Sequence, residues 1–258
     1  MKKLKWIRTV ILGVCLSATA MAGPFGEVYF ESVGYDHAGT LYTTLRPKWG
    51  WSLFEGEKSR IESYALLRLD MDSKTLAATD GAIVTDNYFF AGAGVDWMGV
   101  LPGVRLTALA GYAKDLVERS QRSGVEVRAG WISDHRIVLS SSGPRLSEEI
   151  YTDGLYIRRY RDFIASAQAR TYWELLGKEG STSSWDFGPL LTGAFSVDSE
   201  RDSGWRYAEL RAGGRLRFKY DIQLTLQAYA LRGVSYDAQP AAQYYDDSRI
   251  VLTGGVSF

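Results

Sequence analysis

The sequence predicts an all-β protein, an antiparallel up-and-down transmembrane β-barrel of about 12 strands, with ten strands as the alternative count. Apolar and polar side chains alternate with a period of two along most of the chain, as in strands with one apolar face. The alternating runs last about 9 to 14 residues, whereas ordinary strands have about 5 to 6 and tilted membrane strands about 9 to 11. No run of 18 apolar residues, which would predict a membrane helix, follows the first 22 residues.

The first 22 residues have the pattern of a secretory signal peptide. Four basic residues fall within the first eight positions, and an apolar segment covers 9–20. Ala20-Met21-Ala22 then offers small residues for cleavage before Gly23. An N-terminal membrane anchor is the alternative, but the apolar segment is shorter than the roughly 20 residues that span a bilayer. We therefore expect a signal peptide at 1–22 and a barrel domain at 23–258, located in the outer membrane of a Gram-negative cell after cleavage.

Charge and cysteine content narrow the functional classes. The chain has 30 basic and 30 acidic residues, and four of the basic ones belong to the predicted leader, so the mature chain carries a net charge of −4. Nucleic-acid binding is not expected, because it requires a basic face. Cys15 is the only cysteine and also lies in the leader, so no disulfide supports the exported domain. Closure of a sheet into a barrel, which pairs every backbone group, is one way to stabilise such a chain.

The strands follow from the alternation, taken in order along the chain. In 41–53, for example, leucines, a proline and tryptophans occupy the odd positions and mostly polar residues the even ones. The seventh strand is the weakest, because Ile137, Val138 and Leu139 do not alternate. The predicted strands are 26–34, 39–54, 59–72, 86–98, 104–115, 123–132, 135–142, 159–175, 184–196, 204–218, 221–233 and 247–258.

The connections and tryptophans suggest an orientation with both termini in the periplasm. Short turns at 55–58, 99–103, 133–134, 176–182 and 219–220 would then be periplasmic, and longer loops at 73–85, 143–158 and 234–246 would be external. Tryptophan prefers the headgroup level of a membrane. Only Trp205 is placed at the outer ends of the strands, and six tryptophans are placed toward the periplasmic ends: Trp49, Trp51, Trp97, Trp131, Trp173 and Trp185.

The last strand ends on an aromatic residue. Apolar positions alternate from Ile250 through Val256 to Phe258. A final strand that ends on an aromatic residue resembles the signal by which outer-membrane barrels are recognised for assembly. We therefore expect the barrel-assembly machinery to be a partner, with Val256 and Phe258 as the signal it reads.

The sequence contains few candidate catalytic residues. Some outer-membrane barrels hydrolyse lipids and need a histidine base beside a nucleophile. The only histidines are His37, expected in an outer loop, and His135, expected at a periplasmic turn. We expect no enzyme activity, no cofactor and no metal site; a lipid hydrolase with His37 as its base is the least favoured alternative.

The inward faces of the predicted strands are rich in arginine and tyrosine. Such a lumen has two interpretations. In the first, arginine–carboxylate pairs close the lumen. In the second, a ladder of arginines with tyrosines guides an anionic or sugar polymer, because arginine donors match carboxylates. The candidate lumen residues along such a path are Arg46, Arg60, Tyr64, Arg68, Arg128, Arg170, Tyr172, Tyr207, Arg211, Arg215 and Tyr229.

Several short motifs add a resemblance to a known family. They are 70–73 (DMDS), 86–88 (DNY) followed by Gly92 and Gly94, 151–156 (YTDGLY) leading into 159–162, 198–201, and 244–249 (YYDDSR) at the start of the last strand. Over roughly 60–258 the chain resembles the C-terminal barrels of exopolysaccharide-secretion outer-membrane proteins, including cellulose-export and phage-adsorption types. Those relatives usually carry a tetratricopeptide scaffold on the same chain, and no 34-residue helical repeat occurs here.

The resemblance implies an outer-membrane component of polysaccharide secretion that acts as a passive conduit. Its partners would be outer-membrane lipid and lipopolysaccharide and a polysaccharide ligand. The departure from the relatives leaves two options: a separate periplasmic tetratricopeptide scaffold protein as a further partner, or a different role altogether. The alternative is a closed structural or receptor barrel whose outer loops are the functional surface.

Overall fold

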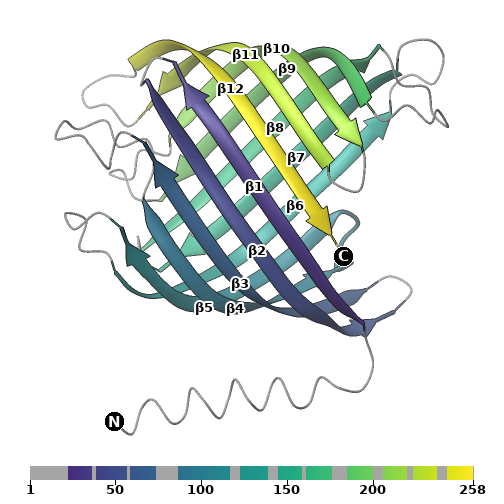
Figure 1. The fold of residues 1–258 in the computed structure, drawn as a ribbon, viewed down its shortest axis with the longest axis vertical. Coiled ribbons are helices and arrows are strands. Elements are labelled where there is room, and N and C mark those ends of the chain that lie inside the picture. The colour runs from purple at the N-terminus through teal and green to yellow at the C-terminus, as the bar shows by residue number, and fades with distance from the viewer. Residues whose placement is uncertain are drawn as a thin grey trace, which may run out of the picture.

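Twelve antiparallel strands close into one barrel in the computed structural model, which describes residues 23–36, 39–56, 59–73, 87–116, 123–138, 145–158, 161–175, 185–199, 206–219, 223–236 and 243–257. Each strand pairs with its neighbours in sequence, and β1 pairs with β12 to close the barrel (Figure 1). The strands are β1 Pro24–Tyr35, β2 Thr40–Glu55, β3 Arg60–Asp72, β4 Tyr88–Met98, β5 Val104–Asp115, β6 Gly124–Val138, β7 Arg145–Ile157, β8 Asp162–Glu174, β9 Trp185–Asp198, β10 Tyr207–Lys219, β11 Gln223–Ser235 and β12 Gln243–Ser257.

The predicted fold class and the count of twelve are confirmed, but the seventh strand was placed wrongly. Residues 135–138 continue β6, and β7 occupies 145–157, most of the segment expected to be an outer loop. The predicted turn at 133–134 therefore lies inside β6, and so does His135, whose ring lies against Gly103. The predicted turn at 176–182 falls outside the described residues, as do the predicted signal peptide, Trp205 and Phe258.

Strand β7 escaped prediction because its faces mix polar and apolar residues. Glu149 accepts a hydrogen bond from Tyr172, which faces the lumen, so the odd-numbered residues of β7 face the lumen too. Leu155 and Ile157 are then apolar residues on the inner face, and Glu148 is a charged residue on the outer face. The alternation that marks the other strands is therefore lost in this one.

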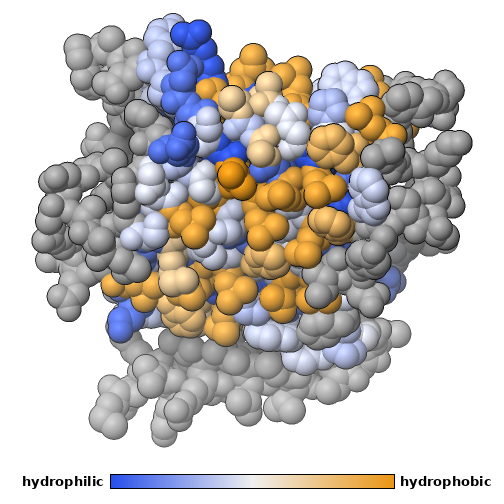
Figure 2. Space-filling model, turned by 45° about the horizontal axis from the view of Figure 1, so that its top comes forward, coloured by the Kyte–Doolittle hydropathy of each residue, from blue (hydrophilic) through white to orange (hydrophobic). Residues whose placement is uncertain are grey.

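The outer surface of the barrel is hydrophobic. Figure 2 shows hydrophobic side chains covering a large part of the strand surface turned toward the viewer. Because a lipid bilayer offers no hydrogen bonds, a closed barrel with an apolar outer band is a structure that can span it. Exposed outward-facing residues include Leu41, Leu45, Phe89, Val95, Leu191, Phe195, Leu226, Ile250 and Leu252.

Tryptophans mark one end of this surface. We call the rim at which β1 begins and β12 ends the terminal rim, and the opposite one the distal rim; in Figure 1 the terminal rim lies to the right. Five exposed tryptophans lie near the terminal-rim ends of their strands, as predicted: Trp49, Trp51, Trp97, Trp173 and Trp185. Trp131 is also exposed, but it lies in the middle of the longer β6 and packs on Phe163 with ring centroids 5.7 Å apart.

No helix long and hydrophobic enough to cross a membrane occurs in the part of the chain that the structure describes. The β4–β5 turn places Gly99 and Gly103 at φ of 87° and 70°, a left-handed conformation that glycine adopts without steric cost. Val256, the described half of the predicted assembly signal, lies in β12 opposite Val28 of β1.

Candidate functional site: the barrel lumen

The interior of the barrel is charged and densely paired. All eleven candidate lumen residues belong to strands, and their positions on the inner face follow from contacts such as those of Arg46 with Glu27 and of Arg215 with Asp186. Their part in a polymer path remains a prediction. The candidate set omitted the β1 residues Glu27 and Tyr29, although their alternation with Gly26, Val28 and Phe30 was a signal that could have found them.

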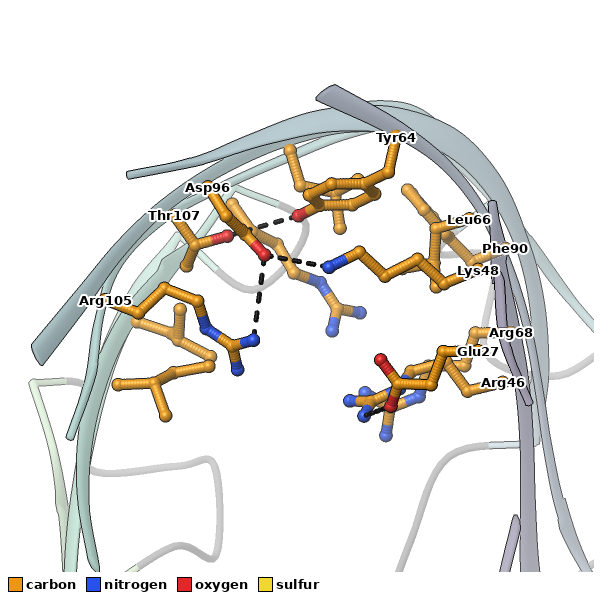
Figure 3. A pocket seen from close by; sticks show the side chains of 14 residues that line it. Glu27, Arg46, Lys48, Tyr64, Leu66, Arg68, Phe90, Asp96, Arg105 and Thr107 are labelled. Atoms are coloured by element: carbon orange, nitrogen blue, oxygen red, sulfur yellow. Dashed lines mark hydrogen bonds and ion pairs between the residues drawn. The ribbon is translucent and has the colours of Figure 1, made fainter. Parts of the chain in front are cut away.

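Ion pairs join strands along the wall that β2 to β5 form. The Lys48 ammonium lies 3.0 Å from the Asp96 carboxylate and 3.7 Å from Glu62, and Arg105 reaches Asp96 from the other side at 3.7 Å. Arg60 contacts Glu62 at 2.6 Å. Figure 3 shows Lys48 and Arg105 converging on Asp96. These contacts tie four consecutive strands together near the terminal rim.

A second group lies further toward the distal rim on the same wall. The Arg68 guanidinium donates to Asp70 at 2.9 Å, and Asp70 also accepts from the Thr44 hydroxyl at 2.7 Å. Arg128 pairs with Glu126 and donates to the Tyr88 hydroxyl at 2.7 Å. The two guanidiniums therefore meet at the ring of Tyr88, which is 5.6 Å from Arg68 and 5.7 Å from Arg128.

Two further networks occupy the opposite wall. Near the distal rim, Glu209 accepts hydrogen bonds from Arg211, Arg249 and Tyr245 at 2.7 to 2.8 Å. Near the terminal rim, Asp186 lies 3.5 Å from Arg215 and 2.9 Å from Arg217. Arg215 also stacks 3.6 Å from the centre of the Tyr172 ring, whose hydroxyl donates to Glu149.

Two of the lumen arginines are comparatively accessible. Arg46 and Arg105 are among the more accessible lumen cations, with 37% and 35% of their side chains exposed.

Aromatic rings and glycines support several of these cations. The Tyr64 ring covers Gly94, its partner on β4, and the Lys48 ammonium lies 4.1 Å from the ring centre. Phe90 covers Gly92 and Gly111 in the same way, with Arg128 5.7 Å from its ring. We call these arrangements glycine–aromatic–cation stacks. The ring occupies the space beside the glycine that a side chain would otherwise fill, and the cation lies over the ring.

The stacks predict a steric effect of small substitutions. A Cβ at Gly94 would lie 2.6 Å from the Tyr64 ring and 2.8 Å from the Ala108 carbonyl oxygen. We expect Gly94→Ala to destabilise the barrel by about 1–3 kcal/mol, measured by urea unfolding in lipid vesicles with tryptophan fluorescence. The cost should shrink in a Tyr64→Ala background. An unchanged cost would show that the backbone contact, and not the ring, is responsible. Gly193→Ala, with nothing within 4 Å, is the matched control and should not destabilise.

A pocket runs along the β1–β7 wall of the lumen. A cavity of about 110 Å³ is lined by five basic side chains and two acidic ones, together with aliphatic residues. A second, larger cavity of about 410 Å³ near the terminal rim shares Glu27, Lys48 and Arg105 with the first, so the two are adjacent. The basic lining residues of the first cavity are Arg46, Lys48, Arg68, Arg105 and Arg128, and the acidic ones are Glu27 and Asp96.

The described part of the lumen presents cationic groups that can bind anions. His135 is exposed and lies on the outer face of β6 by the parity of that strand, and His37 lies outside the described residues. Among the described residues no group of three or more histidine, cysteine, aspartate or glutamate side chains is arranged to hold a metal ion. Guanidinium and ammonium groups in a hydrated lumen suit reversible contacts with anions.

Comparison with known proteins gives barrels of the same kind. No family model matches the chain, and no curated protein matches it. Among solved structures, the chain is similar to the beta domain of the Bordetella autotransporter BrkA (9% identity, 91% of this chain and 98% of that one, TM-score 0.42). It is also similar to a bacterial polysaccharide outer-membrane secretin (9%, 91% and 98%, 0.43) and to an outer-membrane channel from Pseudomonas putida F1 (9%, 93% and 97%, 0.42).

These likenesses do not extend beyond the barrel architecture. The closed sheet, the hydrophobic outer face and the charged lumen are the features that define transmembrane barrels of bacterial outer membranes. The chain is an outer-membrane β-barrel.

Proposed function

We propose that this barrel is a passive conduit that takes part in the secretion of an anionic exopolysaccharide across the outer membrane. The observation that carries the proposal is the excess of basic over acidic side chains around the two adjacent lumen cavities. The carboxylates that neutralise Arg68 and Arg128, Asp70 and Glu126, do not line the pocket, so its surface presents the cations. A polymer of uronic acid residues carries carboxylates that match guanidinium donors.

The proposal assigns each rim and partner a role. The terminal rim would face the periplasm, where a separate tetratricopeptide scaffold protein would deliver the polymer. The outer surface would contact lipid and lipopolysaccharide, and the barrel-assembly machinery would insert the chain. The lumen would supply no catalytic group; it would hold the polymer weakly at successive sites, so that the polymer advances without becoming trapped.

Single-channel recording of the refolded mature protein in a planar bilayer tests the proposal. We expect discrete, anion-selective openings that oligogalacturonate blocks. Arg46→Gln and Arg105→Gln should each raise the blocking concentration by about fivefold, which corresponds to roughly 1 kcal/mol for an accessible charge. Arg232→Gln is the matched control, because this arginine lies on the outer face with 77% of its side chain exposed, and it should change nothing.

Other outcomes would overturn the conduit. Cation-selective openings, or openings that oligogalacturonate does not affect, would remove the proposed role of the pocket. A silent bilayer from a correctly folded barrel would instead favour the closed structural or receptor barrel, in which the paired walls fill the lumen and the outer loops act.

A further inference from the structure

Two cations of the smaller lumen cavity have counter-ions that lie outside it. Arg68 pairs with Asp70, whose side chain is 1% exposed. Arg128 pairs with Glu126, whose side chain is 0% exposed. The two arginines line the cavity, and the two carboxylates do not. Because opening a buried ion pair leaves an uncompensated charge, these pairs should stay closed when a ligand enters the cavity.

Glu27 is a counter-ion of a different kind, because it lines the cavity together with the cation that it faces. Its carboxylate lies 3.7 Å from the Arg46 guanidinium, and 35% of the Glu27 side chain and 37% of the Arg46 side chain are exposed. Figure 3 shows Glu27 beside Arg46, apart from the cluster around Asp96. An exposed ion pair contributes little free energy, so another ion can separate it. A ligand in the cavity can therefore compete for either partner.

Arg46 has a second support that does not depend on Glu27. Tyr29 of β1 stands opposite Arg46 in the strand register, and the guanidinium lies 4.9 Å from the centre of the Tyr29 ring. The ring attracts the cation wherever the Glu27 carboxylate points. When the ion pair opens, the guanidinium should therefore stay in the cavity and offer its donors to another carboxylate.

We infer that Glu27 is a built-in competitor of the anionic polymer: its carboxylate and those of the polymer are alternative partners of the Arg46 guanidinium. This inference rests on the proposed function and specifies how the site releases its ligand. Each polymer carboxylate displaces Glu27 when it binds, and Glu27 returns to Arg46 when that carboxylate moves on. Glu27 thus weakens the hold of the site on the polymer and shortens each contact, while Arg68 and Arg128 keep a fixed positive charge in the cavity.

Block of single-channel current by oligogalacturonate tests the inference on the refolded mature barrel. Glu27→Gln should lower the blocking concentration about fivefold, because Arg46 loses its competing partner. Each block should also last longer, since a tighter contact mainly slows dissociation.

Glu31→Gln is the matched control. Glu31 lies two positions further along the same face of β1, accepts a hydrogen bond from the Tyr29 hydroxyl at 3.0 Å, and is outside the residues that line either cavity. The change removes the same charge from the lumen, and the glutamine amide oxygen can still accept from Tyr29. It should therefore alter the blocking concentration far less than Glu27→Gln does.

The effect of Glu27→Gln should also require Arg46. In an Arg46→Gln background, Glu27→Gln should change neither the blocking concentration nor the duration of a block, because the guanidinium for which the carboxylates compete is gone. The double-mutant cycle measures this dependence. Simple repulsion between Glu27 and the polymer would persist in that background.

The results separate this inference from the proposed function. An unchanged block in Glu27→Gln, an equal effect of Glu31→Gln, or an effect that survives Arg46→Gln would overturn the competitor and leave the conduit for anionic polymers standing. Absence of block in the wild type would overturn the conduit and the competitor together.

Discussion

Replacing Glu209 with glutamine should destabilise the folded barrel by about 3–5 kcal/mol. The Glu209 side chain is 2% exposed and accepts hydrogen bonds from Arg211, Arg249 and Tyr245. Glutamine keeps the shape but removes the negative charge, so two guanidiniums would remain close together without their shared counter-ion. Urea unfolding of the variant in lipid vesicles, followed by tryptophan fluorescence, would measure the loss.

The ion pair between Glu27 and Arg46 offers a matched control for stability. Glu27 is also a lumen carboxylate facing an arginine, but 35% of its side chain is exposed and the pair is 3.7 Å apart. Glu27→Gln should therefore cost less than about 1 kcal/mol, as exposed ion pairs do. If Glu209→Gln cost no more than Glu27→Gln, the Glu209 network would be screened by lumen water and would not stabilise the wall.

An arginine introduced on the outer face should also destabilise the barrel strongly. Leu252 is exposed on the outer side of β12, where the surrounding residues face lipid. Leu252→Arg should cost about 2–4 kcal/mol near the middle of the bilayer, because the guanidinium cannot be hydrated there. The same unfolding measurement in vesicles would report the change.

The adjacent residue tests whether the penalty comes from lipid. Thr253 faces the lumen and stands opposite Glu31 of β1. Thr253→Arg places the same side chain one position further along the strand, beside a carboxylate and water, and should cost less than about 1 kcal/mol. Equal penalties for the two variants would mean that the two faces of β12 do not divide lipid from water.

The strands and their facing could largely be predicted from the sequence, because a barrel wall with lipid outside and water inside imposes a period of two. The prediction of strands failed where the lumen-facing side of a strand is not polar. Leu155 and Ile157 line the lumen, so β7 lost its pattern, and the non-alternating residues Ile137 and Val138 were assigned to a strand of their own instead of to the end of β6. The period-two alternation reflects the polarity of side chains on the two faces of a strand. It is lost wherever apolar side chains face the lumen.

The lumen site could be predicted only in part. Arginines and tyrosines on inward positions, such as Arg68 and Tyr64, were visible from parity. Their partners were not, because the stack of Lys48 on Tyr64 on Gly94 joins three strands whose register the sequence does not specify. Phe90 and Leu109 were overlooked for another reason: apolar residues on an inner face contradict the pattern that located the others.

The closed seam between β1 and β12 limits how any molecule in the lumen could leave. Pairing is continuous from Glu27 opposite Ser257 to Tyr35 opposite Arg249, and the Arg249 guanidinium also lies 4.7 Å from the Tyr35 ring centre. Parting these strands would expose backbone N–H and C=O groups to hydrocarbon, at several kcal/mol for each group. A sideways exit into the bilayer is therefore closed to any molecule in the lumen, which could enter or leave only at the two rims.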